Sequence, residues 1–94
     1  MLYAVKAHYR PGTEERRNAL STEFSQHIRQ PLLHIRFLAS LLDGRGERSG
    51  LLMLMEADGP ELVRSFLDQS PYSREGVYDG LEIDELQIEA GSLG

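Results

Sequence analysis

The chain has 94 residues, a length that fits one domain and is too short for two. Fifteen Asp and Glu against ten Lys and Arg give a formal charge of −5, which repels a phosphate backbone, so we expect no nucleic-acid partner. The sequence has no stretch of ~20 apolar residues for a membrane span, no secretory leader at Met1–Val5 and no cysteine, so we expect a cytoplasmic protein without membrane partners or disulfides.

The first segment, Leu2–Tyr9, alternates in hydropathy and predicts a β-strand. One face is expected to carry Tyr3, Val5, Ala7 and Tyr9, and the other Leu2, Ala4, Lys6 and His8. The turn signal at Arg10–Gly12 ends this strand.

A helix is expected to follow, capped by the hydroxyl of Thr13 and carrying Glu14 and Glu15 in its first turn. Its apolar stripe consists of Leu20, Phe24, His27 and Ile28. Pro31 ends the helix, because the residue before a proline is pushed out of the α region.

The middle of the chain predicts two strands joined by a hairpin loop. Leu32–Leu42 has a period of two. One face is expected to carry Leu33, Ile35, Phe37, Ala39 and Leu41, and the other His34, Arg36, Leu38 and Ser40. Asp43–Gly50 is typical of a mobile loop, and Leu51–Met55 is apolar on both sides, as in a central strand covered on both faces.

A second helix is indicated by the capping-box spacing of Asp58 and Glu61, with Pro60 in the first turn. Its buried stripe consists of Leu62, Val63, Phe66 and Leu67. Ser70-Pro71 breaks it.

Gly80 precedes a last strand, expected over Leu81–Ala90. The apolar positions change parity within this segment, which predicts a bulge near Asp84-Glu85. Residues 91–94 are expected to form a loose tail.

The resulting order βαββαβ predicts a ferredoxin-like α+β fold over residues 1–90, with a four-stranded antiparallel sheet and two helices on one face. The other face needs a cover, because the central strand is apolar on both sides and a small domain buries a low fraction of its surface. We therefore expect a homodimer, built as a dimeric α+β barrel with a cleft between its subunits.

Several short motifs lie along the chain. They are Leu2-Tyr3-Ala4-Val5, Pro11-Gly12 followed by Arg17, Leu41-Leu42-Asp43-Gly44, and Glu56-Ala57-Asp58 leading through Phe66 to Ser70-Pro71-Tyr72 and Gly76-Val77-Tyr78. Together they resemble the YCII-related (YciI-like) proteins over nearly the whole chain, most specifically between Leu51 and Tyr78. The resemblance implies a ferredoxin-like fold, a dimer, and a cleft in which a helix-borne His and the Asp of an Asp-Pro-Tyr motif form a general acid/base pair.

This chain departs from that pattern at both positions. Ser70 stands where the family has Asp, which removes the carboxylate that would orient an imidazole. Counting from Pro11-Gly12, the family's His falls on Phe24, and His27 follows one turn later. We name His27 as the candidate catalytic base, since an imidazole with a pKa of ~6.5 suits proton transfer at neutral pH. The alternative is a histidine packed in the core or at an interface.

Candidate ligand-binding residues fall into two groups. By alternation, His8, His34 and Arg36 share the face away from the helices with Lys6, where they either bind a carboxylate or enolate or pair with the acidic strand residues Glu82 and Asp84.

The second group consists of Arg17, Ser70 and Tyr72. The resemblance implies a cleft at these positions, and the alternatives are a solvated surface for Arg17 and simple turn contacts for the two hydroxyls. The three histidines lack paired ligand spacing, so we predict no metal and no cofactor.

Two functions remain open from the sequence. One is a small-molecule enzyme that carries out proton transfer or elimination on a small carboxylate in a cleft at the dimer interface. The other is a non-catalytic binding or interaction module that has lost the family's His/Asp pair. RNA-recognition domains share the element order, but they need exposed aromatic residues on the central strands, and Leu51–Ala57 has none.

Overall fold

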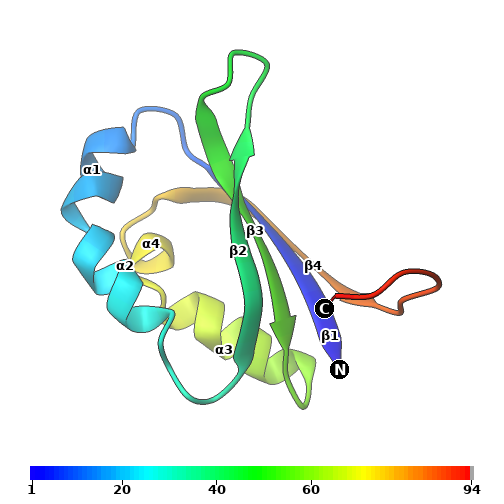
Figure 1. Ribbon diagram of the computed structural model, residues 1–94. Coiled ribbons are helices and arrows are strands. Elements are labelled where there is room, and N and C mark those ends of the chain that lie inside the picture. The colour runs from blue at the N-terminus through cyan, green and yellow to red at the C-terminus, as the bar shows by residue number, and fades with distance from the viewer. Residues whose placement is uncertain (94) are drawn as a thin grey trace.

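The computed structural model describes residues 1–93 and has the predicted ferredoxin-like topology. The strands are β1 (Leu2–Tyr9), β2 (His34–Leu42), β3 (Arg48–Glu56) and β4 (Tyr78–Leu86). The helices are α1 (Glu14–Ala19), α2 (Ser21–His27), α3 (Pro60–Gln69) and α4 (Pro71–Arg74). All strand pairs are antiparallel in the order β2-β3-β1-β4, so β2 and β4 are the edges of an open sheet (Figure 1).

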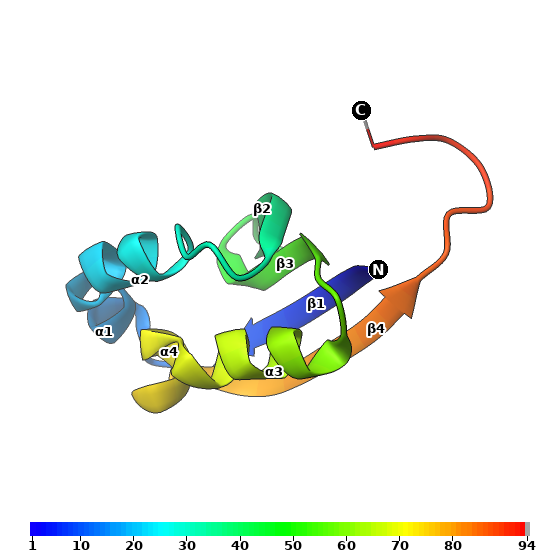
Figure 2. The same cartoon turned by 90° about the horizontal axis from the view of Figure 1, so that it is seen from below.

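The inner face of the sheet is the one that α3 covers (Figure 2), and it carries the core. The predicted alternation of β1 is confirmed, since Tyr3, Val5 and Ala7 are at most 2% exposed. Their neighbours on β3 include Met53 and Met55, which are equally buried. The predicted stripe of α3 supplies the opposing layer through Val63, Phe66 and Leu67.

The predicted faces of β2 are wrong beyond Arg36. Ile35 lies opposite Met55, whereas the next pair joins Phe37 to Leu54, so Arg36 is an extra residue at a bulge. A shift of one residue moves every following side chain to the other face. Leu38 therefore packs against the core, and Phe37 is 42% exposed on the outer face.

The first predicted helix is broken in two. Leu20 separates α1 from α2 because its backbone, at φ −94° and ψ 2°, leaves the helical region, and α2 ends at His27, before the proline stop expected at Pro31. Thr13 precedes α1 but its side chain forms no capping hydrogen bond. Its hydroxyl instead donates to the Arg10 carbonyl oxygen at 2.6 Å.

Two predicted boundaries around the β2–β3 hairpin shift. β2 begins at His34, two residues after the predicted start, and β3 begins at Arg48, so the loop is shorter than Asp43–Gly50. The turn is held by Asp43, whose Oδ1 accepts the backbone N–H groups of Arg45 at 2.8 Å and Glu47 at 3.0 Å.

The second predicted helix begins later than expected. Gly59, not Asp58, is the residue before α3, and no side chain caps it. Ser70-Pro71 ends α3 as predicted, and the short helix α4 follows.

The last strand lies earlier in the chain than predicted, and its bulge is at the other end. Tyr78 lies opposite Tyr9 and Leu81 opposite Ala7, so β4 has one residue more than β1 in this interval. Gly80 supplies the positive φ of 106° that this bulge requires. No bulge occurs at Asp84-Glu85, because the strand ends at Leu86 and the later apolar positions lie outside the sheet. Of the predicted tail, Gly94 lies outside the described residues.

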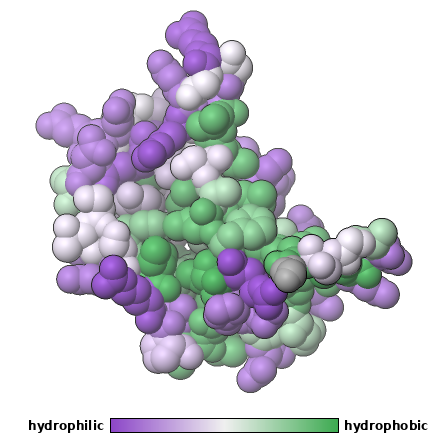
Figure 3. Space-filling model, in the orientation of Figure 1, coloured by the Kyte–Doolittle hydropathy of each residue, from purple (hydrophilic) through white to green (hydrophobic). Residues whose placement is uncertain are grey.

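The outer face of the sheet has no helix over it in residues 1–93 (Figure 2). Apolar side chains on this face come from Leu2, Ala4, Phe37, Ala39, Leu41, Leu52, Leu54 and Leu86. Figure 3 views this face and shows an apolar patch at its centre. Within residues 1–93, no helix combines the length and apolar character needed to cross a bilayer.

Candidate functional site

A cavity of about 410 Å³ opens where the hairpin end of the sheet meets the helices. We call it the Arg17 cavity, and it is lined by Tyr9, Glu14, Arg17, Asn18, Ser21, Glu47, Arg48 and Tyr72. These residues come from the end of β1, the helices α1, α2 and α4, and the base of the β2–β3 hairpin. Its volume lies within the range of small-molecule sites.

Arg17 is held in place from two sides. One guanidinium nitrogen donates to the Thr13 hydroxyl at 2.9 Å, and the guanidinium carbon lies 4.0 Å from the centre of the Tyr9 ring. A guanidinium has five N–H donors, and this stacked position leaves most of them available. Among residues 1–93, no carboxylate forms an ion pair with Arg17. Within the described part of the chain, the side chain is therefore an oriented cation without an ion-pair partner.

Aromatic rings form the wall behind Arg17. Tyr72 packs parallel to Phe24 at 4.3 Å between ring centres, and Tyr9 lies parallel to Tyr78 at 6.4 Å. Tyr72 meets both of these other tyrosines edge-on, at 6.3 Å and 5.8 Å. Its hydroxyl donates to the Arg17 carbonyl oxygen at 3.4 Å. These contacts give the cavity a rigid wall.

Burial raises the pKa of Tyr9, Tyr72 and Tyr78, most strongly that of Tyr78. At neutral pH all three phenols are therefore uncharged hydrogen-bond donors. Tyr9 and Tyr72 line the cavity, whereas the Tyr78 hydroxyl is buried behind them without a hydrogen-bond partner in residues 1–93. Ser70 is its polar neighbour, but the two hydroxyls do not reach hydrogen-bond geometry.

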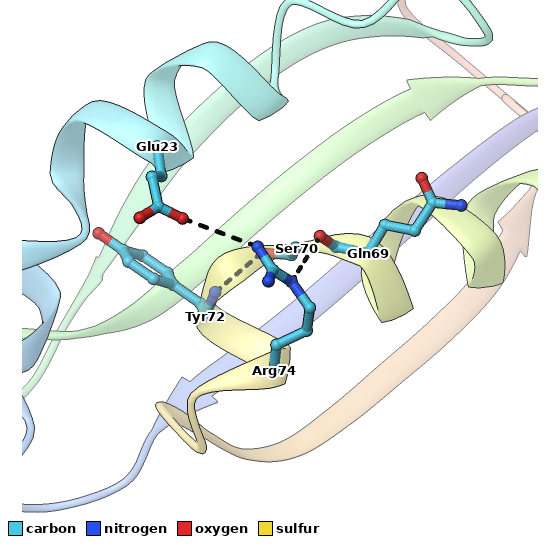
Figure 4. A network of polar contacts seen from close by, with 5 residues as sticks. All are labelled: Glu23, Gln69, Ser70, Tyr72 and Arg74. Atoms are coloured by element: carbon cyan, nitrogen blue, oxygen red, sulfur yellow. Dashed lines mark hydrogen bonds and ion pairs between the residues drawn. The ribbon is translucent and has the colours of Figure 1, made fainter.

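The corner that positions Tyr72 is the predicted Ser70-Pro71-Tyr72 motif. Ser70 is 1% exposed, and its hydroxyl caps α4 by accepting the Tyr72 N–H at 3.2 Å. Figure 4 shows that Arg74 of this corner contacts Gln69 of α3 and Glu23 of α2. Its Nε donates to the Gln69 carbonyl oxygen at 3.3 Å, and an exposed ion pair joins it to Glu23 of α2 at 3.7 Å. Ser70 is not among the residues that line the cavity, so its contact with a ligand stays a prediction.

His27 lies outside the Arg17 cavity. Its ring stacks on Phe66 at 4.5 Å, and its Nε2 is 2.8 Å from the Phe66 carbonyl oxygen. A carbonyl oxygen only accepts, so Nε2 carries the proton and donates it there. The adjacent cavity has a volume of only about 60 Å³. The catalytic role of His27 stays a prediction, and the contacts of its ring are those of a packing residue.

The other predicted group lies on the outer face. His8 and His34 are exposed there, opposite Gly50 and Glu56 of β3. Arg36 projects from the bulge and donates to Glu56 at 2.7 Å in a partly exposed ion pair. The structure thus brings Arg17 and Tyr72 together in one cavity and leaves the outer-face group on another surface.

Two important residues of this cavity, Tyr9 and Arg48, were not predicted from the sequence. Tyr9 shares the predicted inner-face parity of β1, and this parity was a signal that it faces the helices. Arg48 was assigned to a mobile loop, and only the early start of β3 places it at the cavity. In residues 1–93, no three His, Cys, Asp or Glu side chains gather as metal ligands would.

Solved structures resemble this chain in fold. No family model and no curated protein matches the sequence. The solved structure of 5-chloro-2-hydroxyhydroquinone dehydrochlorinase (TftG) from Burkholderia phenoliruptrix, in complex with 2,5-dihydroxybenzoquinone, matches with a TM-score of 0.81 and 20% identity, over 93% of this chain and 94% of that one. A protein described as a candidate antibiotic biosynthesis monooxygenase from Chloroflexus aurantiacus matches with a TM-score of 0.48 and 12% identity, over the full length of both chains. The first match establishes the fold, and membership of the YciI-like family stays a prediction.

Proposed function

We propose that this protein binds a small, planar anion of carboxylate, enolate or phenolate chemistry in the Arg17 cavity. The observation that carries the proposal is the Arg17 guanidinium, which is fixed over the Tyr9 ring, has no carboxylate partner among residues 1–93 and lines a cavity of suitable size. A guanidinium in this state favours a flat oxyanion, which it can hold through two parallel hydrogen bonds.

The rest of the cavity supports the same ligand class. Arg48 adds a second cation, and the neutral phenols of Tyr9 and Tyr72 can donate hydrogen bonds to oxygen atoms on a ring. Glu14 and Glu47 also line the cavity, and they disfavour highly charged ligands such as polyphosphates. The dehydrochlorinase of the same fold was solved with a ring compound that carries acidic hydroxyls, and this ligand gives a first compound to test.

Acid/base chemistry on such a ligand is the catalytic version of this proposal. It requires a base at the cavity, and the available carboxylates are those of Glu14 and Glu47. Binding without turnover is the second candidate function. It is favoured by Ser70 in place of the family's Asp and by the engagement of His27 Nε2 with the Phe66 carbonyl oxygen.

We also propose that two copies associate through their outer faces as a homodimer. A standard interface takes about 800 Å² from each partner, about an eighth of the 6233 Å² surface of this chain. A two-fold axis that runs parallel to the strands between two stacked sheets places β2 of one copy over β4 of the other. This arrangement brings His34 and Arg36, the latter already paired with Glu56, toward Glu82 and Asp84 of the other copy.

The test measures binding of 2,5-dihydroxybenzoquinone and a panel of hydroxybenzoates by calorimetry, with turnover followed by ligand absorbance. Arg17→Ala should weaken binding at least tenfold, which corresponds to about 1.4 kcal/mol. Arg16→Ala is the matched control, since Arg16 lies outside the cavity and donates to the Glu75 carbonyl oxygen.

Arg36→Ala tests the rival site on the outer face. If that face forms the binding cleft, the anion is lost in Arg36→Ala and the dimer is kept. Unchanged affinity in Arg17→Ala would overturn the Arg17 cavity as the site. Tight binding without product would identify a binding module, and turnover would identify an enzyme.

A further inference from the structure

The turn between β1 and α1 (Figure 1) contains a buried threonine whose hydroxyl does not cap the helix. Thr13 is 9% exposed and directly precedes α1, where a threonine hydroxyl ordinarily accepts a backbone N–H of the first helical turn. The Thr13 hydroxyl makes no such bond. It donates its proton to the Arg10 carbonyl oxygen at 2.6 Å, and its oxygen accepts a guanidinium N–H of Arg17 at 2.9 Å. The hydroxyl that could cap α1 therefore holds the Arg17 side chain instead.

The Arg10 end of this hydrogen-bond chain is anchored to the segment that leads into β4. The backbone N–H of Arg10 donates to the Val77 carbonyl oxygen at 2.7 Å, and its Nε donates to the Gly76 carbonyl oxygen at 3.2 Å. Val77 is fully buried in the core. The Arg10 carbonyl oxygen is therefore fixed to the body of the protein, and Thr13 links the Arg17 guanidinium to it.

The two contacts of the Arg17 guanidinium restrict different motions. The Tyr9 ring lies 4.0 Å from the guanidinium carbon, which fixes the height of the group above the ring but not its rotation over the ring. A hydrogen bond at one nitrogen stops that rotation, and among residues 1–93 the Thr13 hydroxyl supplies it. Thr13 is β-branched and therefore stiff at χ1, so the direction of this acceptor is itself well defined.

We infer that Thr13 is a positioning residue of the Arg17 cavity, which orients the guanidinium so that its remaining N–H groups are ready for a planar anion. This inference rests on the proposed function and names a residue that supports it. A bidentate hydrogen bond to a flat oxyanion needs two N–H groups in a fixed plane. Without the Thr13 bond, the long Arg17 side chain must be ordered by the ligand, which lowers the affinity. Thr13 does not line the cavity, so it acts through Arg17 and not by contact with the ligand.

The test compares Thr13→Val with Thr13→Ser in calorimetric titrations of 2,5-dihydroxybenzoquinone. Valine keeps the branched shape and removes the hydroxyl, whereas serine keeps the hydroxyl. Thr13→Val should weaken binding about fivefold, the effect of leaving one long side chain to be ordered by the ligand, and Thr13→Ser should bind within about twofold of the native chain. The matched control is Thr22→Val, which makes the same change at an exposed position of α2 outside the cavity and should leave the affinity unchanged.

A double-mutant cycle separates positioning from general support of the fold. If Thr13 acts through Arg17, Thr13→Val should cause no further loss of affinity in a chain that already carries Arg17→Ala. An equal loss with and without Arg17→Ala would show that the hydroxyl only supports the turn, which overturns the inference.

NMR relaxation of the Arg17 Nε–H group in the free protein gives a second measurement that needs no ligand. The order parameter of this group should be lower in Thr13→Val than in Thr13→Ser and in the native chain. Equal order in all three chains would overturn the inference. A loss of affinity in Arg17→Ala with none in Thr13→Val would also overturn it and leave the proposed function standing, whereas unchanged affinity in Arg17→Ala would overturn the proposed binding site itself.

Discussion

The two faces of the sheet use the same strands in different ways. On the inner face, Val5, Met53 and Met55 are at most 1% exposed under the helices. On the outer face, Phe37 is 42% exposed and Leu86 39%, although both are as apolar as the core residues. The inner face therefore stabilises the single chain, and the outer face is an apolar surface suited to association.

The comparison also separates two kinds of polar site. The Arg17 cavity lies on the helix side, where aromatic rings and a partly buried cation are held in fixed positions. The outer-face ion pair of Arg36 and Glu56 is partly solvated and therefore contributes little energy. A preorganised binding site needs an environment like that of the Arg17 cavity, because side chains that are already fixed lose less conformational entropy when a ligand binds.

The largest expected effect comes from the inner face. Met55→Ala leaves a cavity in the core and should lower the free energy of unfolding by about 2–5 kcal/mol in urea titrations. Leu52→Ala, on the outer face of the same strand, is the control and should cost much less at protein concentrations low enough for a monomer. If Met55→Ala and Leu52→Ala lowered the free energy of unfolding equally at low protein concentration, the two faces would not differ as described.

The next effect concerns association. Phe37→Asp places a charge at the proposed interface of both copies and should weaken dimerisation at least 100-fold, about 2.7 kcal/mol. The variant should still fold, because Phe37 is outside the core cluster. Sedimentation across a concentration series measures the effect, and an unchanged dimer would place the interface elsewhere.

The smallest expected effect concerns a buried hydroxyl, that of Tyr78, whose contribution to stability depends on pH. Tyr78→Phe removes a buried hydroxyl that has no hydrogen-bond partner among the described residues, and it should change stability at pH 7 by less than about 1 kcal/mol. In the native chain, burial raises the pKa of Tyr78 above its unfolded value of ~10. The unfolded chain therefore releases this proton first, and stability falls above pH ~10 by up to about 1.4 kcal/mol per pH unit.

The variant lacks this group, so its stability should fall less steeply in alkaline solution than that of the native chain. Urea titrations of both chains between pH 9 and 11 measure the difference. Parallel curves would show that the Tyr78 hydroxyl reaches solvent or a partner in solution.

Local patterns predicted the parts of the fold that depend on near neighbours. The alternation of β1 and the stripe of α3 each follow from burial of one face, and both are confirmed. The β2 pattern failed because a bulge at Arg36 is decided by pairing with β3, which lies across a hairpin. No periodicity within β2 signals an extra residue, since both faces of this strand carry apolar side chains.

The candidate site was predicted only in part. The resemblance pointed to Arg17 and Tyr72, and the structure places both at one cavity. Tyr9 and Arg48 are 39 residues apart in sequence and become neighbours of the cavity only because β1 and β3 pair and the hairpin turn is short. Contacts between such distant segments leave no local signal in a single sequence.

The sequence by itself determined the element order, the topology of the α+β fold and the apolar character of its central strand. These properties follow from local propensity and from hydropathy periods that any strand or helix must satisfy. The tertiary structure alone decided which face of β2 holds Phe37, which cation stacks on Tyr9, and how the Ser70 hydroxyl is used. These features depend on strand register and on packing between residues far apart in the chain, and packing is specific to the assembled fold.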